Sequence, residues 1–333
     1  MSPPGRPRTS LSWSTRSGRA LIVQGALLAL LAVGALALWR NVEGALAARQ
    51  IRSGFGFITE PAGFDIGEGL VPYTPRDSYL LAFAAGVANT LRVSLLGVVL
   101  ATLLGTLIGV GRLSRNLLVR AGCTAYVEVL RNIPLIILLF GIYLVLTELL
   151  PDAMEPVVLG GAYLSKGGLQ VPLPSWDHGW ALERPEMGPF GVSGGLSLTP
   201  EFLALLLGLT LSTAASIAEI VRSGVLAVPN GQTEAAAALG LTPRQGTRLV
   251  LLPQALRIIV PPMTSQFLNL TKNSSLAVAI GYPDVVSIAN TAINQNGQAL
   301  ECILVIMAVY LSINLVTALL MNLYGRRVAL VER

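Results

Sequence analysis

Polar side chains gather within an otherwise apolar stretch of this chain, residues 256–281. They are Gln266, Asn269, Lys272, Asn273, Ser274 and Ser275. On a helix, Gln266, Asn269 and Asn273 recur at i, i+3 and i+7 and form one stripe, with Lys272 beside it. Polar groups in lipid usually face a bundle interior or a water-filled path. A lysine can meet a carboxylate, and the amides and hydroxyls offer donors and acceptors. The stripe therefore indicates either a path for a polar solute or hydrogen bonds that join helices.

Other polar residues lie near the ends of apolar stretches. Asn89 and Thr90 lie near the start of the stretch 82–111 and join the candidate path. Glu219 closes the stretch 202–221, and Arg222 follows three residues later, a spacing that favours an ion pair on a helix. The Pro261-Pro262 pair predicts a break in the helix that carries the polar stripe.

The composition indicates a membrane protein. Of 333 residues, 53% are hydrophobic and 12% are charged, and the mean hydropathy is +0.66. A soluble domain carries about 25% charged residues. A net charge of +5 is typical of some nucleic-acid-binding proteins, but the arginines here lie beside apolar runs rather than in one patch. We therefore expect membrane lipid, and not nucleic acid, as the partner of this charge.

Six stretches are long and apolar enough to span a membrane, which takes about 20 residues. They lie at roughly 20–39, 82–111, 132–150, 202–221, 256–281 and 301–322. The first resembles a cleaved signal, with a small-residue motif at Ala35–Ala37, but its apolar core is longer than such signals have. We expect an all-α integral membrane protein with about six transmembrane helices.

The distribution of charge gives the orientation. Segments 1–19, 112–131, 222–257 and 323–333 hold 15 Lys and Arg against 3 acids, whereas 40–79, 150–200 and 281–300 hold 6 against 11. Because Lys and Arg favour the cytoplasmic side, we expect a multi-pass membrane protein with both termini in the cytoplasm. The predicted order is a tail 1–19, a first helix 20–39, an outer loop 40–79, a transmembrane domain 80–325 and a tail 326–333. The domain 80–325 includes an outer loop 150–200 and a cytoplasmic segment 230–254.

Several kinds of chemistry are excluded. Neither Lys166 nor Lys272 belongs to a nucleotide-binding loop of the G-x-x-x-x-G-K-[ST] type, so the chain does not carry its own ATP site. Two cysteines, Cys123 and Cys302, and one histidine, His178, supply no metal framework and no catalytic triad. We expect no catalytic residue, metal or cofactor in this chain, so any energy comes from a partner.

The segment 230–254 predicts a short, capped helix pair. A helix over Thr233–Leu239 ends at Gly240, since glycine most easily takes the left-handed conformation after a helix. Thr242 is then an N-cap, and Gln245 completes a capping box. The second helix runs to Leu252-Pro253, where we expect it to end.

Three interpretations of this pair compete. The run Ala235–Ala238 has little side-chain bulk, which lets another protein approach closely. A docking element for a cytoplasmic motor is the interpretation we favour. The alternatives are a structural loop and a helix-turn-helix DNA reader, and the second is disfavoured between two spans.

Two outer segments, 40–79 and 150–200, are longer than simple connections. Both are rich in glycine, and the second also holds many prolines. They form either irregular packing over the helix ends or a docking surface for an outside partner.

The helix-pair sequence "EAAAALGLTPRQGTRLVLLP" fits the pattern E-A-A-x3-G-x9-[IV]-x-L-P. Its fixed positions are Glu234, Ala235, Ala236, Gly240, Val250, Leu252 and Pro253. This pattern resembles the EAA loop of membrane subunits of ATP-binding-cassette importers. "LSTAASIAEIVRSGVLAVPNGQTEAA" and "AYVEVLRNIPLIILLFGIY" resemble the polar amino acid permease branch, and "SGFGFITEPAGFDIGEGLVPYT" is similar to the longer permease of general L-amino acid uptake systems.

The resemblance implies the type I (MetI-like) importer permease fold and a place in the bacterial inner membrane, with loops 40–79 and 150–200 on the periplasmic side. It implies an ATPase subunit that uses ATP and Mg, a second permease that forms a heterodimer with this one, and a periplasmic binding protein that delivers amino acids. The polar stripe would then receive the two ends of an amino acid. Loop 150–200 is shorter than expected for the subgroup, which puts in doubt any extra helices that its members have there.

Two other functions stay open at this point. An ion-coupled secondary transporter would need a relay of carboxylates inside the membrane and a repeated architecture. The acids of the apolar stretches, Glu148, Glu201, Glu219 and Glu301, lie near stretch ends, and no repeat is evident. A membrane scaffold that transports nothing is the second alternative.

Overall fold

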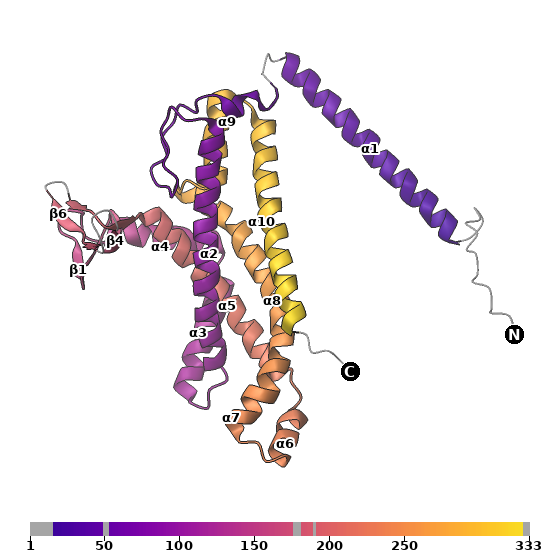
Figure 1. Cartoon of the computed structure of the whole chain (residues 1–333), viewed down its shortest axis with the longest axis vertical. Coiled ribbons are helices and arrows are strands. Elements are labelled where there is room, and N and C mark those ends of the chain that lie inside the picture. The colour runs from indigo at the N-terminus through magenta and orange to yellow at the C-terminus, as the bar shows by residue number, and fades with distance from the viewer. Residues whose placement is uncertain (1–15, 49–52, 176–180, 189–190, 329–333) are drawn as a thin grey trace. The chain divides into compact units, whose positions relative to one another are not determined.

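The structure is a computed structural model that describes residues 16–48, 53–175, 181–188 and 191–328. The chain forms two compact units, Met1–Phe55 and Gly56–Arg333. The first unit contains α1 (Arg16–Ala48), drawn in indigo in Figure 1. Its stretch Ile22–Leu38 is predominantly apolar. This helix carries the predicted first span. Among its described residues, Ile22–Leu38 falls just short of the length that crosses a membrane.

The second unit is built around long helices (Figure 1). Its bundle contains α2 (Tyr79–Gly111), α3 (Leu117–Asn132), α4 (Leu135–Leu144), α5 (Pro200–Leu226), α8 (Leu252–Asn273) and α10 (Ala299–Val328). The helices α2 and α5 pack closely because Gly105 and Gly109 leave the facing side of α2 bare, opposite Ile217 and Val221. A Cβ atom on Gly105 would lie 2.7 Å from Cβ of Ile217.

The described residues contain three helices long and apolar enough to span a membrane, or five if two bent pairs are each counted as one span. The single helices are α2, α5 and the part of α10 over Ala299–Gly325. This number is lower than the predicted six. Two of the predicted spans are parts of bent helix pairs, and the first lies in α1, where the apolar stretch Ile22–Leu38 is too short to be counted.

The first bent pair joins α3 to α4 and a π turn, η2 (Val145–Leu149), at an angle of 104°. The predicted span 132–150 therefore corresponds to α4 and η2, which begin at Leu135. The helix α3 lies in segment 112–131, which was predicted only as a cytoplasmic connection. Pro134 explains the break, because a residue before proline is pushed towards extended backbone. Ile133 has φ −90° and ψ 124°.

The second bent pair joins α7 (Pro243–Gly246) and α8, through a 3-10 helix, η4 (Ser274–Ile280), to α9 (Val285–Asn296), at an angle of 48°. The bend follows Gly281, which has φ +82°. The break predicted at Pro261-Pro262 is wrong, since both prolines lie inside α8. Each proline removes one backbone hydrogen bond, and packing of α8 against α5 and α10 maintains the helix there.

The expectation of an all-α chain is wrong for the outer loop 150–200, which holds short strands. They are β1 (Val157–Leu159), β2 (Ala162–Ser165), β3 (Gly168–Val171), β4 (Leu173–Ser175), β5 (Ala181–Glu183), β6 (Glu186–Gly188), β7 (Gly191–Ser193) and β8 (Leu196–Leu198). One antiparallel sheet has the order β1-β2-β3-β8, and β4-β5 and β6-β7 form two-stranded sheets. Gly160 and Gly161, with φ +57° and +93°, make the two-residue turn of the first hairpin. The described part of this loop contains no helix.

The buried apolar residues form two clusters. One lies within the bundle and includes Leu139, Leu209 and Ile217. The other contains η1 (Phe55–Thr59), the first turns of α2, α9 and the start of α10, which meet around Phe57 and Phe83. It lies at the end of the bundle opposite α7 (Figure 1), which we call the outer end after the predicted orientation. The segment 56–78 is therefore a packed part of the molecule rather than a loose loop.

Candidate functional site

The helix pair of segment 230–254 forms as predicted at its centre. The first helix, α6 (Asn230–Ala238), begins three residues before the predicted start at Thr233. Gly240 has φ +79°, and its N–H donates to the carbonyl of Ala237 at 3.0 Å. Glycine therefore ends this helix in the left-handed conformation.

The turn into the second helix contains the predicted capping box. The N–H of Thr242 donates to Oε1 of Gln245 at 2.9 Å, and the N–H of Gln245 donates to the Thr242 hydroxyl at 3.4 Å. The predicted end at Leu252-Pro253 is wrong. The helix α7 continues through a π turn, η3 (Thr247–Leu251), directly into α8. Proline fits the first turn of α8, where a π turn has already altered the hydrogen-bond pattern.

The residues of the EAA pattern differ in their exposure to solvent. Ala236 is buried, and its methyl group lies 3.7 Å from where a Cβ on Gly246 would be. Glu234, Ala235, Gly240 and Leu252 are exposed, whereas Val250 and Pro253 are partly buried. Beside them, Leu239 is 83% exposed.

The predicted path residues divide into two sets. On α8, Asn269, Lys272 and Asn273 are exposed on the surface of this chain, and Gln266 is partly exposed. Ser274 is buried, and its hydroxyl donates to the carbonyl of Thr271 at 2.8 Å. The stripe on α8 therefore faces out of the subunit, and Ser274 does not belong to it.

Asn89 and Thr90 are buried inside α2, more than two turns after its first residue. The Asn89 amide donates to the carbonyls of Glu68 and Pro283, each at 2.9 Å. The Thr90 hydroxyl accepts the N–H of Val285 at 3.2 Å. These side chains connect α2 to the η4–α9 connection.

The predicted ion pair on α5 is confirmed. Nη2 of Arg222 lies 2.6 Å from Oε1 of Glu219. Arg112, at the end of α2, also binds the Glu219 carboxylate. No spacing in the sequence could reveal this second partner, because the two residues are 107 positions apart.

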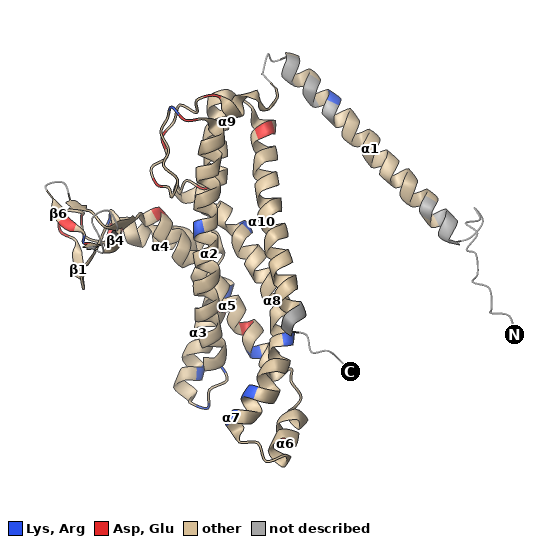
Figure 2. Ribbon diagram, in the orientation of Figure 1, with Lys and Arg blue, Asp and Glu red and all other residues tan. Residues whose placement is uncertain are grey.

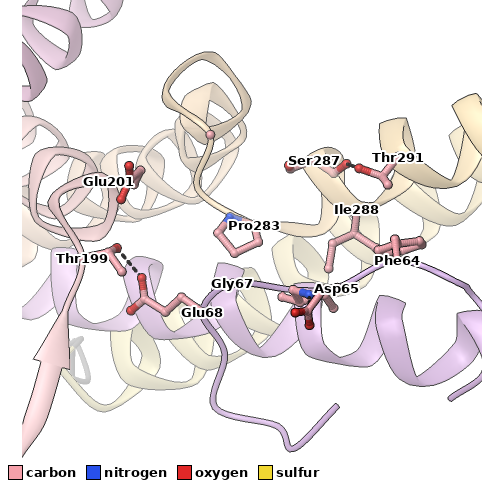
Figure 3. A pocket seen from close by; sticks show the side chains of 12 residues that line it. Phe64, Asp65, Gly67, Glu68, Thr199, Glu201, Pro283, Ser287, Ile288 and Thr291 are labelled. Atoms are coloured by element: carbon pink, nitrogen blue, oxygen red, sulfur yellow. Dashed lines mark hydrogen bonds between the residues drawn. The ribbon is translucent and has the colours of Figure 1, made fainter. Parts of the chain in front are cut away.

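A cavity of about 350 Å³ at the outer end was not predicted (Figure 3). We call it the outer cavity. Its polar lining comes from distant parts of the chain, namely Asp65, Glu68, Thr199, Glu201, Ser287 and Thr291. The only sequence sign of it was the unusual length of segment 40–79.

Residues 64–68, which precede α2 in the chain, form one wall of the outer cavity, and hydrogen bonds and an ion pair hold this wall in place. Nη1 of Arg92 lies 2.6 Å from Oε1 of Glu68, and the Thr199 hydroxyl donates to the same carboxylate. The Tyr73 hydroxyl donates to the carbonyl of Phe64 at 3.0 Å. Burial raises the pKa of Tyr73, so this hydroxyl keeps its proton at neutral pH.

No group of three or more His, Cys, Asp and Glu among the described residues is placed to hold a metal. At the outer cavity the Thr199 hydroxyl contacts the Glu68 carboxylate, but Arg92 already pairs with that carboxylate and ties it to the fold.

Comparison with known families settles the class. Residues 97–330 match the family described as "Binding-protein-dependent transport system inner membrane component". The chain belongs to this family. It is a multi-pass inner membrane permease, and a partner ATPase performs the hydrolysis. The match sets aside the ion-coupled transporter and the scaffold.

Three known proteins illustrate the relationship. The permease is 42% identical to the general L-amino acid transport system permease protein AapQ of Rhizobium johnstonii, over 86% of each chain. A solved amino acid ABC transporter, crystallised with histidines, matches with a TM-score of 0.56 and 26% identity over 75% of this chain and 95% of that one. The inward-facing MetNI methionine transporter, at 21% identity and a TM-score of 0.53 over 75% of this chain and 98% of that one, shows the shared MetI-like fold.

Proposed function

We propose that this permease imports amino acids delivered by a periplasmic binding protein, and that the α6–α7 pair transmits movement from the ATPase. The substrate class is supported by the relatives, which are named as amino acid permeases. The observation that carries the coupling role is the capped helix pair with Leu239 83% exposed. A rigid pair with an apolar tip suits the groove of another subunit, because helices docked in a groove bind through such anchors.

The orientation in this proposal has both termini and α6–α7 in the cytoplasm, with six spans that include α1. Figure 2 shows Lys and Arg gathered at the end of the bundle that carries α6 and α7. Acidic residues lie mainly on segment 56–78, on the loop that holds the strands, and near the ends of α4, α9 and α10 that lie away from α6 and α7. This arrangement fits the rule that basic residues remain inside.

The exposed stripe on α8 supports a second permease as a partner. An exposed lysine within an apolar span is costly in lipid. A second permease facing Asn269, Lys272 and Asn273 would remove this stripe from lipid and leave a polar path between the two subunits. In that arrangement Gln266 and Lys272 are the candidates to meet substrate.

Replacing Leu239 by Asp tests the coupling role. The change places a charge on the exposed tip, and we expect binding of the ATPase and amino acid uptake to fall at least about tenfold, as for loss of an interface anchor. Co-purification of the ATPase and uptake by reconstituted vesicles are the measurements. Leu159→Asp, on the outer strand β1 and 54% exposed, is the matched control and should leave ATPase binding unchanged. Normal ATPase binding and uptake by Leu239→Asp would refute the coupling role.

A further inference from the structure

Glu68 joins segment 56–78 to three other parts of the molecule. Its carboxylate binds Arg92 on α2 at 2.6 Å and accepts the hydroxyl proton of Thr199, the N-cap of α5. Its backbone carbonyl accepts a hydrogen bond from Asn89, whose amide also reaches Pro283 before α9. Glu68, which precedes the bundle in the chain, thus connects α2, α5 and the start of α9.

The ion pair is shielded from solvent. The side chains of Glu68 and Arg92 are each only 10% exposed. The Arg92 guanidinium lies 4.0 Å from the ring centroid of Phe202, which is 1% exposed. A buried charge without its counter-ion is strongly unfavourable, so Glu68 has little freedom to leave this place.

The position of Glu68 sets one wall of the outer cavity (Figure 3). Residues 64–68 form this wall, and Ser287 and Thr291 on α9 and Glu201 on α5 also line the cavity. None of the described residues that line it is Lys or Arg. Arg92 is occupied with Glu68, so the carboxylates of Asp65 and Glu201 are left to set the charge of the cavity.

We infer that Glu68 is a positioning residue for substrate admission: its ion pair with Arg92 fixes segment 64–68 as a wall of the outer cavity. The inference rests on the proposed importer function, which makes the outer end the side of delivery. Glu68 acts through the segment that it holds, since its carboxylate is already bound by Arg92 and Thr199. A role confined to folding is the competing explanation.

The test uses three variants, each compared with the unmodified protein. They are the double variant Glu68→Gln/Arg92→Gln, Thr199→Val, and its conservative counterpart Thr199→Ser. The double variant removes both charges, so no unpaired charge is left to unfold the chain. Thr199→Ser keeps the hydroxyl that binds Glu68. Hydrogen exchange of residues 64–70 is measured by mass spectrometry on the permease complex in lipid nanodiscs. Amino acid uptake is measured in vesicles against the concentration of loaded binding protein.

We expect the double variant to exchange residues 64–70 about tenfold faster, because the charge-assisted bonds that hold them are gone. The concentration of binding protein for half-maximal uptake should rise about tenfold, with the maximal rate within about twofold of the unmodified complex. Thr199→Val should act in the same direction and more weakly, and Thr199→Ser should behave as the unmodified protein. Asp152→Asn, which removes an exposed ion pair with Lys166, is the control and should change neither quantity.

Unchanged exchange and unchanged half-saturation in the double variant would overturn the inference. A lower maximal rate at unchanged half-saturation would also overturn it, since a folding defect gives that result. Failure of the proposed function would give a different result, because the unmodified complex would then take up no amino acid. Hydrogen exchange would still test whether the Glu68–Arg92 pair holds residues 64–70, because this measurement does not depend on transport.

Discussion

At the scale of single residues, position in the fold separates side chains that look alike in the sequence. Asn89 and Asn269 are both amides in apolar stretches, yet Asn89 is fully buried and bonded to two carbonyls while Asn269 is exposed. A buried amide with backbone partners stabilises the fold. An exposed amide beside a lysine is free to meet a partner or a solute.

The prediction at the residue scale concerns Lys272. Lys272→Met should lower amino acid uptake about tenfold or more, because a hydrogen bond to a charged group contributes about 1.5–3 kcal/mol. Uptake by the reconstituted complex at equal amounts of protein is the measurement. Lys166→Met, a partly exposed lysine in the turn that follows β2, should leave uptake unchanged. If Lys272→Met transports normally, Lys272 does not contact the substrate.

At the scale of elements, close helix packing depends on small residues at particular positions. Gly105 on α2 faces Ile217 and the Ala214 carbonyl on α5, whereas Gly122 on α3 has open space where a Cβ would be. The two glycines are chemically identical, and both lie in helices. They differ in what a methyl group would meet.

Alanine at these two positions should therefore have opposite effects. Gly105→Ala should destabilise the permease by about 1–3 kcal/mol, because the added methyl group would lie 2.7 Å from the Ile217 Cβ. Gly122→Ala should stabilise it by up to about 1 kcal/mol, because alanine is the better helix former. Thermal unfolding of the detergent-solubilised chain measures both. Equal melting temperatures for the two variants would contradict the close packing of α2 and α5.

At the scale of the whole molecule, the proposed function requires the α6–α7 pair and the strands to lie on opposite sides of the membrane. The proposal places α6–α7 in the cytoplasm and the outer cavity and strands on the periplasmic side. Only this arrangement lets an ATPase act on one end and a binding protein on the other.

Cysteine labelling tests the orientation directly. In a Cys123→Ser background, Leu239→Cys should resist a membrane-impermeant maleimide applied outside spheroplasts, and Val158→Cys should react. Both side chains are exposed in this chain, at 83% and 62%, so access to the reagent decides the result. Permeabilised cells, in which both cysteines should react, provide the control. Reaction of the cysteine at 239 from outside would invert the proposed topology.

The membrane class, the apolar helices, and the capped pair with Gly240 in the left-handed conformation could be predicted from the order of the residues. These features follow from composition, periodicity and caps, which depend on residues a few positions apart. The folded chain was needed to show that Arg112 joins Glu219, that Asn89 is buried, and that Glu68 meets Arg92 at the outer cavity. Such contacts join residues far apart in the chain, and they depend on how whole helices pack, which no local pattern encodes.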